Sequence, residues 1–282
     1  MGTNNRPRVA IVSTHPIQYH TPWYRALADR PEVETVVLYC HKATAQEQSK
    51  AGFGIEFDWD VSLLDGYQWE FLGNVSQEPA VTFWGLDTPE LAGRIGRREF
   101  DAVVLNGWHY KSAWQAMYAC WRSGTPVMVR SDSHLKSPRH PVKTYAKWPF
   151  YRLFIPRLDS CLPVGIWSRE YFLHYGADPH NVFEVPHIID LDRFGASAAI
   201  GAEERNELRR KWGLSPEKAV FLYAGKFIEK KRPMDFVRSI RRANQLGAQV
   251  SGLMVGDGAL RLCHFTQPGS GHRRWRAWSF GL

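Results

Sequence analysis

The chain has 282 residues, enough for one large domain or two of ordinary size. Hydrophobic residues make up 44% of it and aromatic residues 13%, which excludes a disordered chain and allows a substantial core. The formal charge of +8 favours acidic partners such as phosphates, nucleic acid or anionic lipid, without selecting among them.

The polar start runs directly into a short apolar strand, and the sequence lacks a cleavage-site pattern, so we expect no signal peptide. No stretch approaches the roughly 18 apolar residues of a transmembrane helix, and we expect a cytoplasmic protein. No CxxC or HExxH motif is present, so we expect no metal site. The widely spaced cysteines are expected to be buried free thiols: Cys40, Cys120, Cys161 and Cys263.

The first part of the chain alternates short apolar runs with amphipathic segments, which is typical of a parallel α/β sheet. Thr88 is expected to cap a helix that has Pro89 in its first turn, and Gly124 to end the next helix. The order predicts a Rossmann-like domain. We expect strands at 8–14, 33–40, 101–107, 126–132 and 159–165, and helices at 21–30, 87–100, 112–124 and 168–175.

A second α/β unit is expected after the connection at 184–195. The pattern predicts a helix at 203–214, a strand at 218–225, a helix at 233–247 and a strand at 249–258. Residues 262–282 then contain no acidic residue and no periodicity. We therefore expect a first domain over 1–195, a partial second domain over 196–261, and an irregular tail foreign to the fold, from a frameshift or a truncated gene end.

One loop of the second unit combines glycine with several cations. Gly225 ends the strand in "YAGKFIEKKRP", and Lys226 and Lys231 stand on either side of the loop that precedes a helix. Such a run is either a solvated basic turn or a diphosphate site at a helix start. The next strand ends in "GDG", with Gly256 and Gly258, and this order favours the diphosphate site.

The ordered pair, G-K-x4-K followed by G-D-G, resembles the second domain of family 4 glycosyltransferases, which have the two-domain GT-B fold. The family loop typically reads G-R-x4-K, so Lys226 replaces an arginine. Residues 9–28 and 181–194, with Asp190 and Phe194, resemble the family's first strand, loop and helix and its interdomain passage. The resemblance implies a GT-B-like α/β fold and transfer of a sugar from a UDP- or GDP-linked donor, without a metal cofactor. The family's glutamate-x7-glutamate motif is absent after Asp257, so we expect residues 1–282 to be inactive or impaired.

Several polar residues of the first domain follow strand ends, where open α/β sheets bind ligands. We interpret His15, Gln18, Tyr19, His20 and His109 as acceptor-binding, or alternatively as parts of structural loops. The family often has a histidine after the strand at 126–132. The nearest candidates for a catalytic role here are Asp132 and His134, although an aspartate at a strand end can also cap a helix.

The segment 143–159 interleaves basic and aromatic residues. It could contact an anionic membrane, which would suit a lipid-linked acceptor or polysaccharide precursor, but packing of the aromatics under the sheet is favoured. Two other functions stay open: a non-catalytic module that binds an acceptor or lipid, and a sugar-nucleotide epimerase of the same fold. Nucleic-acid binding through the tail is weaker, because the other cations are dispersed.

Overall fold

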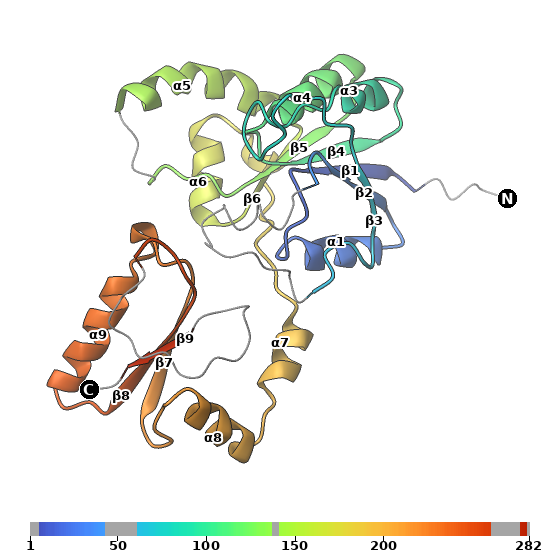
Figure 1. The fold of residues 1–282 in the computed structure, drawn as a ribbon. Coiled ribbons are helices and arrows are strands. Elements are labelled where there is room, and N and C mark those ends of the chain that lie inside the picture. The colour runs from blue at the N-terminus through green and yellow to red at the C-terminus, as the bar shows by residue number, and fades with distance from the viewer. Residues whose placement is uncertain (1–5, 43–60, 137–140, 261–276, 281–282) are drawn as a thin grey trace. The chain divides into compact units, whose positions relative to one another are not determined.

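The computed structural model describes residues 6–42, 61–136, 141–260 and 277–280; for 141–145 and 277–280 it describes the backbone alone (Figure 1). The chain divides into two compact units. Of the described residues, those within 6–42 and 61–189 form unit 1, and those within 190–260 and 277–280 form unit 2. The predicted boundary after residue 195 therefore lies several residues too late, because Asp190 already caps a helix of unit 2 by accepting a hydrogen bond from the Arg193 amide (2.9 Å).

Unit 1 is built on a six-stranded parallel sheet with the order β3-β2-β1-β4-β5-β6. Its strands are β1 (Arg8–Ser13), β2 (Glu34–Tyr39), β3 (Gln68–Phe71), β4 (Ala102–Asn106), β5 (Val127–Ser131) and β6 (Ser160–Pro163). Its helices are α1 (Thr21–Ala28), α3 (Pro89–Gly96), α4 (Lys111–Ser123), α5 (Pro141–Phe154) and α6 (Ile166–His174), with short 3-10 turns η1 (Ile155–Arg157) and η2 (Pro179–Asn181). The strand order reverses between β1 and β4, which is where folds of this type bind ligands.

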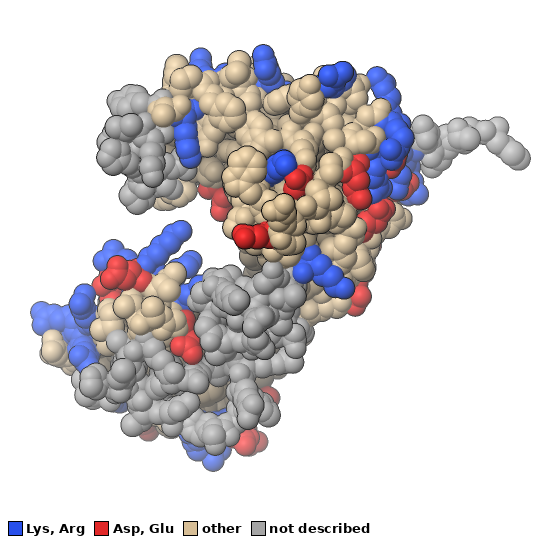
Figure 2. All heavy atoms as spheres, turned by 45° about the horizontal axis from the view of Figure 1, so that its top comes forward, with Lys and Arg blue, Asp and Glu red and all other residues tan. Residues whose placement is uncertain are grey.

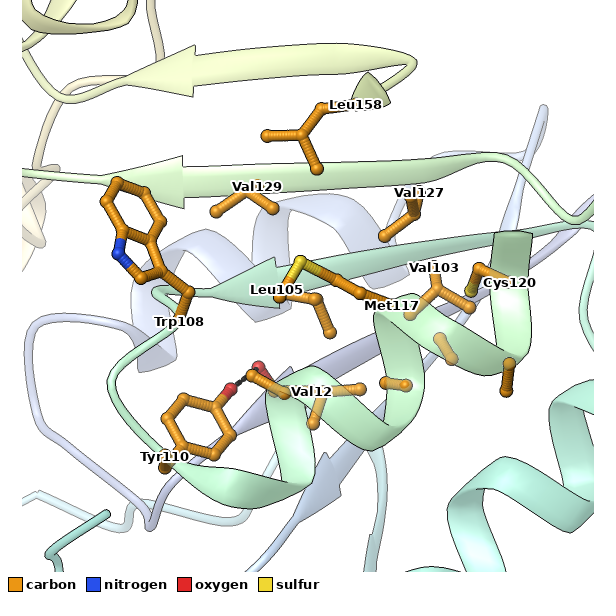
Figure 3. Close-up of a cluster of buried hydrophobic side chains, with 14 of the residues drawn as sticks. Val12, Val103, Leu105, Trp108, Tyr110, Met117, Cys120, Val127, Val129 and Leu158 are labelled. Atoms are coloured by element: carbon orange, nitrogen blue, oxygen red, sulfur yellow. Dashed lines mark hydrogen bonds between the residues drawn. The ribbon is translucent and has the colours of Figure 1, made fainter. Parts of the chain in front are cut away.

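Both faces of this sheet are covered, as near-continuous apolar strands require. Val103 and Leu105 of β4 join the larger core, which includes residues of α3, α4 and α6, whereas Val104 faces the smaller core beside α1. Figure 3 shows the larger core between β4, β5 and α4, where the Tyr110 hydroxyl donates a hydrogen bond to the Val12 carbonyl (3.4 Å). Alternation of side chains along each strand thus fixes the sheet between two layers of helices.

Two elements of unit 1 were not predicted, and one predicted cap is wrong. β3 is a four-residue edge strand with mostly exposed side chains, so it has no apolar run to reveal it. α5 contains Pro149, and a proline in the interior of a segment normally argues against a continuous helix there. Thr88 occupies the N-cap position of α3, but its side chain makes no capping bond; its buried hydroxyl faces the Cys40 sulfur (3.9 Å) instead. Gly124 does end α4, in a left-handed conformation (φ 70°).

Unit 2 contains α7 (Leu191–Ala198), α8 (Ala202–Lys211), β7 (Ala219–Ala224), η3 (Glu229–Lys231), α9 (Pro233–Gln245), β8 (Val250–Val255) and β9 (Ala277–Phe280). β7 and β8 are parallel, and β9 pairs antiparallel with β8. The prediction of a wholly irregular tail is therefore wrong for 277–280, which complete a three-stranded sheet. The stretch 262–276 lies outside the described residues.

Three cysteines, Cys40, Cys120 and Cys161, are buried and free as predicted, while Cys263 lies outside the described residues. Within the described ranges, no helix is both long and apolar enough to cross a bilayer. No group of three or more acidic, histidine or cysteine side chains in the same ranges is placed to hold a metal ion.

Candidate functional site

Unit 1 has a cavity of about 260 Å³ at the carboxyl ends of β1, β4 and β5, beside the point where the strand order reverses. Five of the residues predicted for the site line it: His15, Tyr19, His20, His109 and Asp132. The lining described for this cavity does not include Gln18 or His134, and the His134 ring lies 5.9 Å from the Trp167 ring. The other polar residues of the wall are Ser13, Thr14, Asn106, Arg130, Ser131 and His187.

Arg130 is the most unusual lining residue, because its side chain is only 6% exposed although it carries a permanent charge. Its Nε donates to the Val185 carbonyl (3.3 Å), and its Nη2 donates to the Pro186 carbonyl and to His187 Nδ1 (both 3.3 Å). The guanidinium also lies 5.3 Å from the centre of the Trp23 ring. Arg130 therefore fixes the 185–187 segment against β5 and brings His187 to the cavity.

His20, Ser13 and Asn106 line the cavity and are joined behind its wall by the buried Tyr24 hydroxyl. Asn106 Nδ2 donates to Ser13 Oγ and to the Tyr24 hydroxyl (both 2.8 Å), and these two oxygens lie 2.7 Å apart. His20 Nδ1 lies 3.4 Å from the Tyr24 hydroxyl. Burial, followed by the nearby charge of Arg130, lowers the pKa of His20 to about 3. The imidazole is therefore neutral at physiological pH.

Tyr19 connects the histidines at the rim. Its ring makes edge contacts with His20 (4.8 Å between centroids) and His187 (5.2 Å). Burial and then Arg130 lower the pKa of His187, while Asp132 opposes this shift. Burial and the Asp132 carboxylate raise the pKa of Tyr19. The cavity thus offers the buried cation of Arg130, the carboxylate of Asp132 and the neutral imidazole of His20, which can bind the hydroxyl groups of a polar molecule, and the carboxylate can accept a proton from it.

The sequence interpretation missed Arg130 and His187. Arg130 occupies the fourth position of an otherwise apolar strand, "VMVRS", and an arginine before the strand end is the one local signal. His187 follows no strand, and only its contact with a residue 57 positions earlier brings it to the site. Neither position could be assigned without the tertiary structure.

Unit 2 contains the second candidate site, the loop between β7 and α9. The Tyr223 hydroxyl donates to the carbonyls of Lys226 (3.1 Å) and Lys231 (3.3 Å), so one side chain joins the two ends of the loop. Burial and the charge of Lys231 lower the pKa of Lys226, as expected of two cations held near each other. Arg232 is instead engaged in an ion pair with Asp235 in the first turn of α9.

The two glycines after β8 have a packing role. Gly256 has φ 147°, and a Cβ there would lie 1.9 Å from the Gly225 carbonyl oxygen. Gly258 has φ 154°, and its Cβ would lie 2.6 Å from the Phe227 carbonyl oxygen. The Phe227 amide donates to the Asp257 carbonyl (2.8 Å), which holds the loops together. Close approach of these two loops therefore suffices to require both glycines.

No protein-family model and no curated protein sequence matches the chain. Solved structures with a similar fold include Anabaena Alr3699/HepE in complex with UDP and glucose (TM-score 0.57, 12% identity, 90% of this chain and 62% of that chain). A glycosyltransferase from Rickettsia africae is also similar (TM-score 0.52, 10% identity, 89% of this chain and 68% of that chain). The match to a UDP-N-acetylglucosamine 2-epimerase from Rickettsia bellii has a TM-score of 0.47 (15% identity, 87% of this chain and 61% of that chain). This chain thus spans less than two thirds of the HepE chain.

The similarities to HepE and to the Rickettsia africae glycosyltransferase show the fold. The chain has a GT-B-like architecture, with one Rossmann-like unit on a six-stranded parallel sheet and a second, smaller α/β unit. The predicted fold class is confirmed.

Proposed function

We propose that the chain is a glycosyltransferase that takes its sugar from a nucleotide-sugar donor, in the manner of family 4. Unit 2 would bind the nucleotide diphosphate through Lys226, Lys231 and the first turn of α9. Unit 1 would bind the acceptor in the cavity around Arg130. A single observation carries the proposal: a G-K-x4-K loop and a G-D-G turn follow neighbouring parallel strands of a fold that HepE, solved with UDP, shares.

The charges at the two sites suit the chemistry of sugar transfer. The bond from the sugar C1 to the diphosphate oxygen breaks, a bond from C1 to an acceptor oxygen forms, and the acceptor hydroxyl loses a proton. Lys226 and Lys231 would stabilise the negative charge that develops on the departing diphosphate. Asp132, the carboxylate of the acceptor cavity, would take the proton. His134 has no role in this proposal, since it does not line the cavity.

Nucleotide binding is the first test, because it needs neither an acceptor nor turnover. Calorimetric titration with UDP and with GDP is expected to show binding of one of them. Lys226→Ala and Lys231→Ala should each weaken it about 10- to 100-fold, the cost of one charge-assisted hydrogen bond. Lys230→Ala is the matched control, since it removes an exposed cation of the same loop and should leave the affinity within about twofold.

Three outcomes would contradict the proposal. The first is absence of binding by either nucleotide, and the second is equal weakening by all three lysine variants, which would indicate diffuse charge. The third is epimerisation of a UDP-sugar without transfer, seen by NMR of the sugar protons. Because residues 258–282 contain no acidic residue in place of the family's glutamate pair, we expect transfer by these 282 residues to be undetectable while nucleotide binding persists.

A further inference from the structure

Some of the large apolar side chains of helix α5 pack into the core, and others are exposed to solvent. Phe154 is buried in the larger core, and Tyr151 packs against it. Trp148, Phe150 and Leu153, in contrast, are 46%, 47% and 55% exposed. The expectation that these aromatics pack under the sheet thus holds for one side of the helix. The other side presents large apolar groups to solvent next to one another, and a contiguous exposed apolar patch, unlike a single exposed residue, is typical of an interaction site.

The apolar face continues onto α4. The Phe150 ring lies 5.1 Å from the Trp114 ring, and Trp114 also contacts Phe154. Tyr118, one helical turn beyond Trp114 on the same side of α4, is 59% exposed. Further along α4, Trp121 Nε1 donates to the Arg157 carbonyl (3.1 Å). The two helices therefore form a single exposed surface.

The charged side chains that α4 and α5 themselves carry are all basic, and Asp87 pairs with Lys111 at the start of α4. The sequence has no acidic residue between Asp132 and Asp159, nor within α4, but Lys147, Arg152 and Arg122 are exposed there. The Arg152 guanidinium lies 5.6 Å from the centre of the Trp148 ring, so cation and aromatic are presented together. In Figure 2, which turns the top of Figure 1 toward the viewer, basic side chains are spread over the upper part of unit 1 and the acidic ones lie lower on the same face.

We propose that the exposed surface formed by α5 and the adjoining part of α4 docks on a bilayer that contains anionic lipid. Tryptophan and tyrosine favour the interface between headgroups and acyl chains, and Lys147 and Arg152 would meet the lipid phosphates. A second copy of the same surface is a less favourable occupant, since the cations of the two copies would face each other. The proposal does not rest on the proposed transferase activity.

Vesicle flotation of the 282-residue chain tests the proposal. We expect the chain to float with phosphatidylcholine vesicles that contain phosphatidylglycerol, and to remain below vesicles of phosphatidylcholine alone. Lys147→Glu/Arg152→Glu should weaken vesicle binding at least about tenfold, since each basic residue near an anionic membrane contributes about 1 kcal/mol to the binding free energy. Arg6→Glu/Arg30→Glu is the matched control: it makes the same charge change at two exposed residues outside the surface, and should bind like the unaltered chain.

The apolar contribution is tested separately. Trp148→Ser/Leu153→Ser should lower the affinity about tenfold and leave a binding that high salt abolishes. Trp69→Ser, on the edge strand β3 at the other end of the sheet, should have no effect. Absence of flotation, equal loss in surface and control variants, or binding of single-stranded oligonucleotides with no vesicle binding would each overturn the proposal. UDP titration of the same variants separates this proposal from the proposed function, since a variant that no longer binds vesicles should still bind UDP.

Discussion

At the level of single residues, His20 is held neutral by its surroundings at the start of α1. Its ring is buried among Tyr19, Tyr24 and the charge of Arg130, and its pKa is lowered to about 3. An unfolded chain would protonate this histidine near its ordinary pKa of 6.5. The native state therefore binds fewer protons than the unfolded state between these two values, and this burial makes the fold sensitive to acid.

This difference predicts a pH dependence of stability. The free energy of unfolding does not depend on His20 protonation above pH 6.5. It falls as the pH drops from 6.5 toward about 3, by up to about 1.4 kcal/mol per pH unit, because the unfolded chain binds a proton that the folded chain does not. His20→Gln, which cannot be protonated, should reduce that slope between pH 6.5 and pH 4, as measured by urea unfolding of unit 1. Equal slopes in the two proteins would show that His20 gains a proton in the folded state.

At the level of elements, the buried apolar strands are the ones that the sequence predicts most directly. β1, β2, β4 and β5 are buried runs flanked by helix signals, so their order could be deduced residue by residue. β3 and β9 are four-residue edge strands that no periodic pattern marks in the sequence, whereas the edge strands β6 and β7 are predicted from their apolar runs. Five site residues follow from the strand-end rule, whereas Arg130 depends on contacts with residues 55 to 57 positions away.

The loops that follow β7 (225–227) and β8 (256–258) pack against each other, and we call this contact the junction of β7 and β8. The glycines of the G-D-G motif at this junction have two possible explanations. Gly256 and Gly258 were predicted as nucleotide contacts, yet each is already required by the loop at 225–227. Gly256→Ala should therefore destabilise unit 2 by about 2–3 kcal/mol even without nucleotide, because the new Cβ meets the Gly225 carbonyl in a conformation that alanine resists. Amide hydrogen exchange of β7 and β8 measures this.

The control for the junction is Gly201→Ala. Gly201 has φ −68°, and a Cβ there meets no atom within 4 Å, so the exchange rates of β7 and β8 should stay unchanged. If Gly256→Ala also leaves these rates unchanged while UDP affinity falls, the glycine serves the nucleotide and the packing explanation is wrong.

At the level of the whole molecule, the two units have separate cores. The cores of unit 1 consist of its own strands and helices, and Phe227, Val237 and Met254 form the core of unit 2. Because each unit has its own core, we expect the two units to unfold in separate transitions, each with its own melting temperature. The two proposed sites also belong to different units, and a ligand can therefore be assigned to its unit by the transition that it shifts.

UDP should raise the melting temperature of unit 2 and leave that of unit 1 unchanged. At a UDP concentration of about 100 times its Kd, binding to the native state adds about 2.7 kcal/mol. For a unit of about 100 residues this corresponds to a shift of roughly 10 °C. Calorimetry identifies the transition of unit 2 by its lower temperature in Gly256→Ala. A UDP-induced shift confined to the other transition would place the nucleotide in the cavity beside Arg130 and reverse the assignment of donor and acceptor sites.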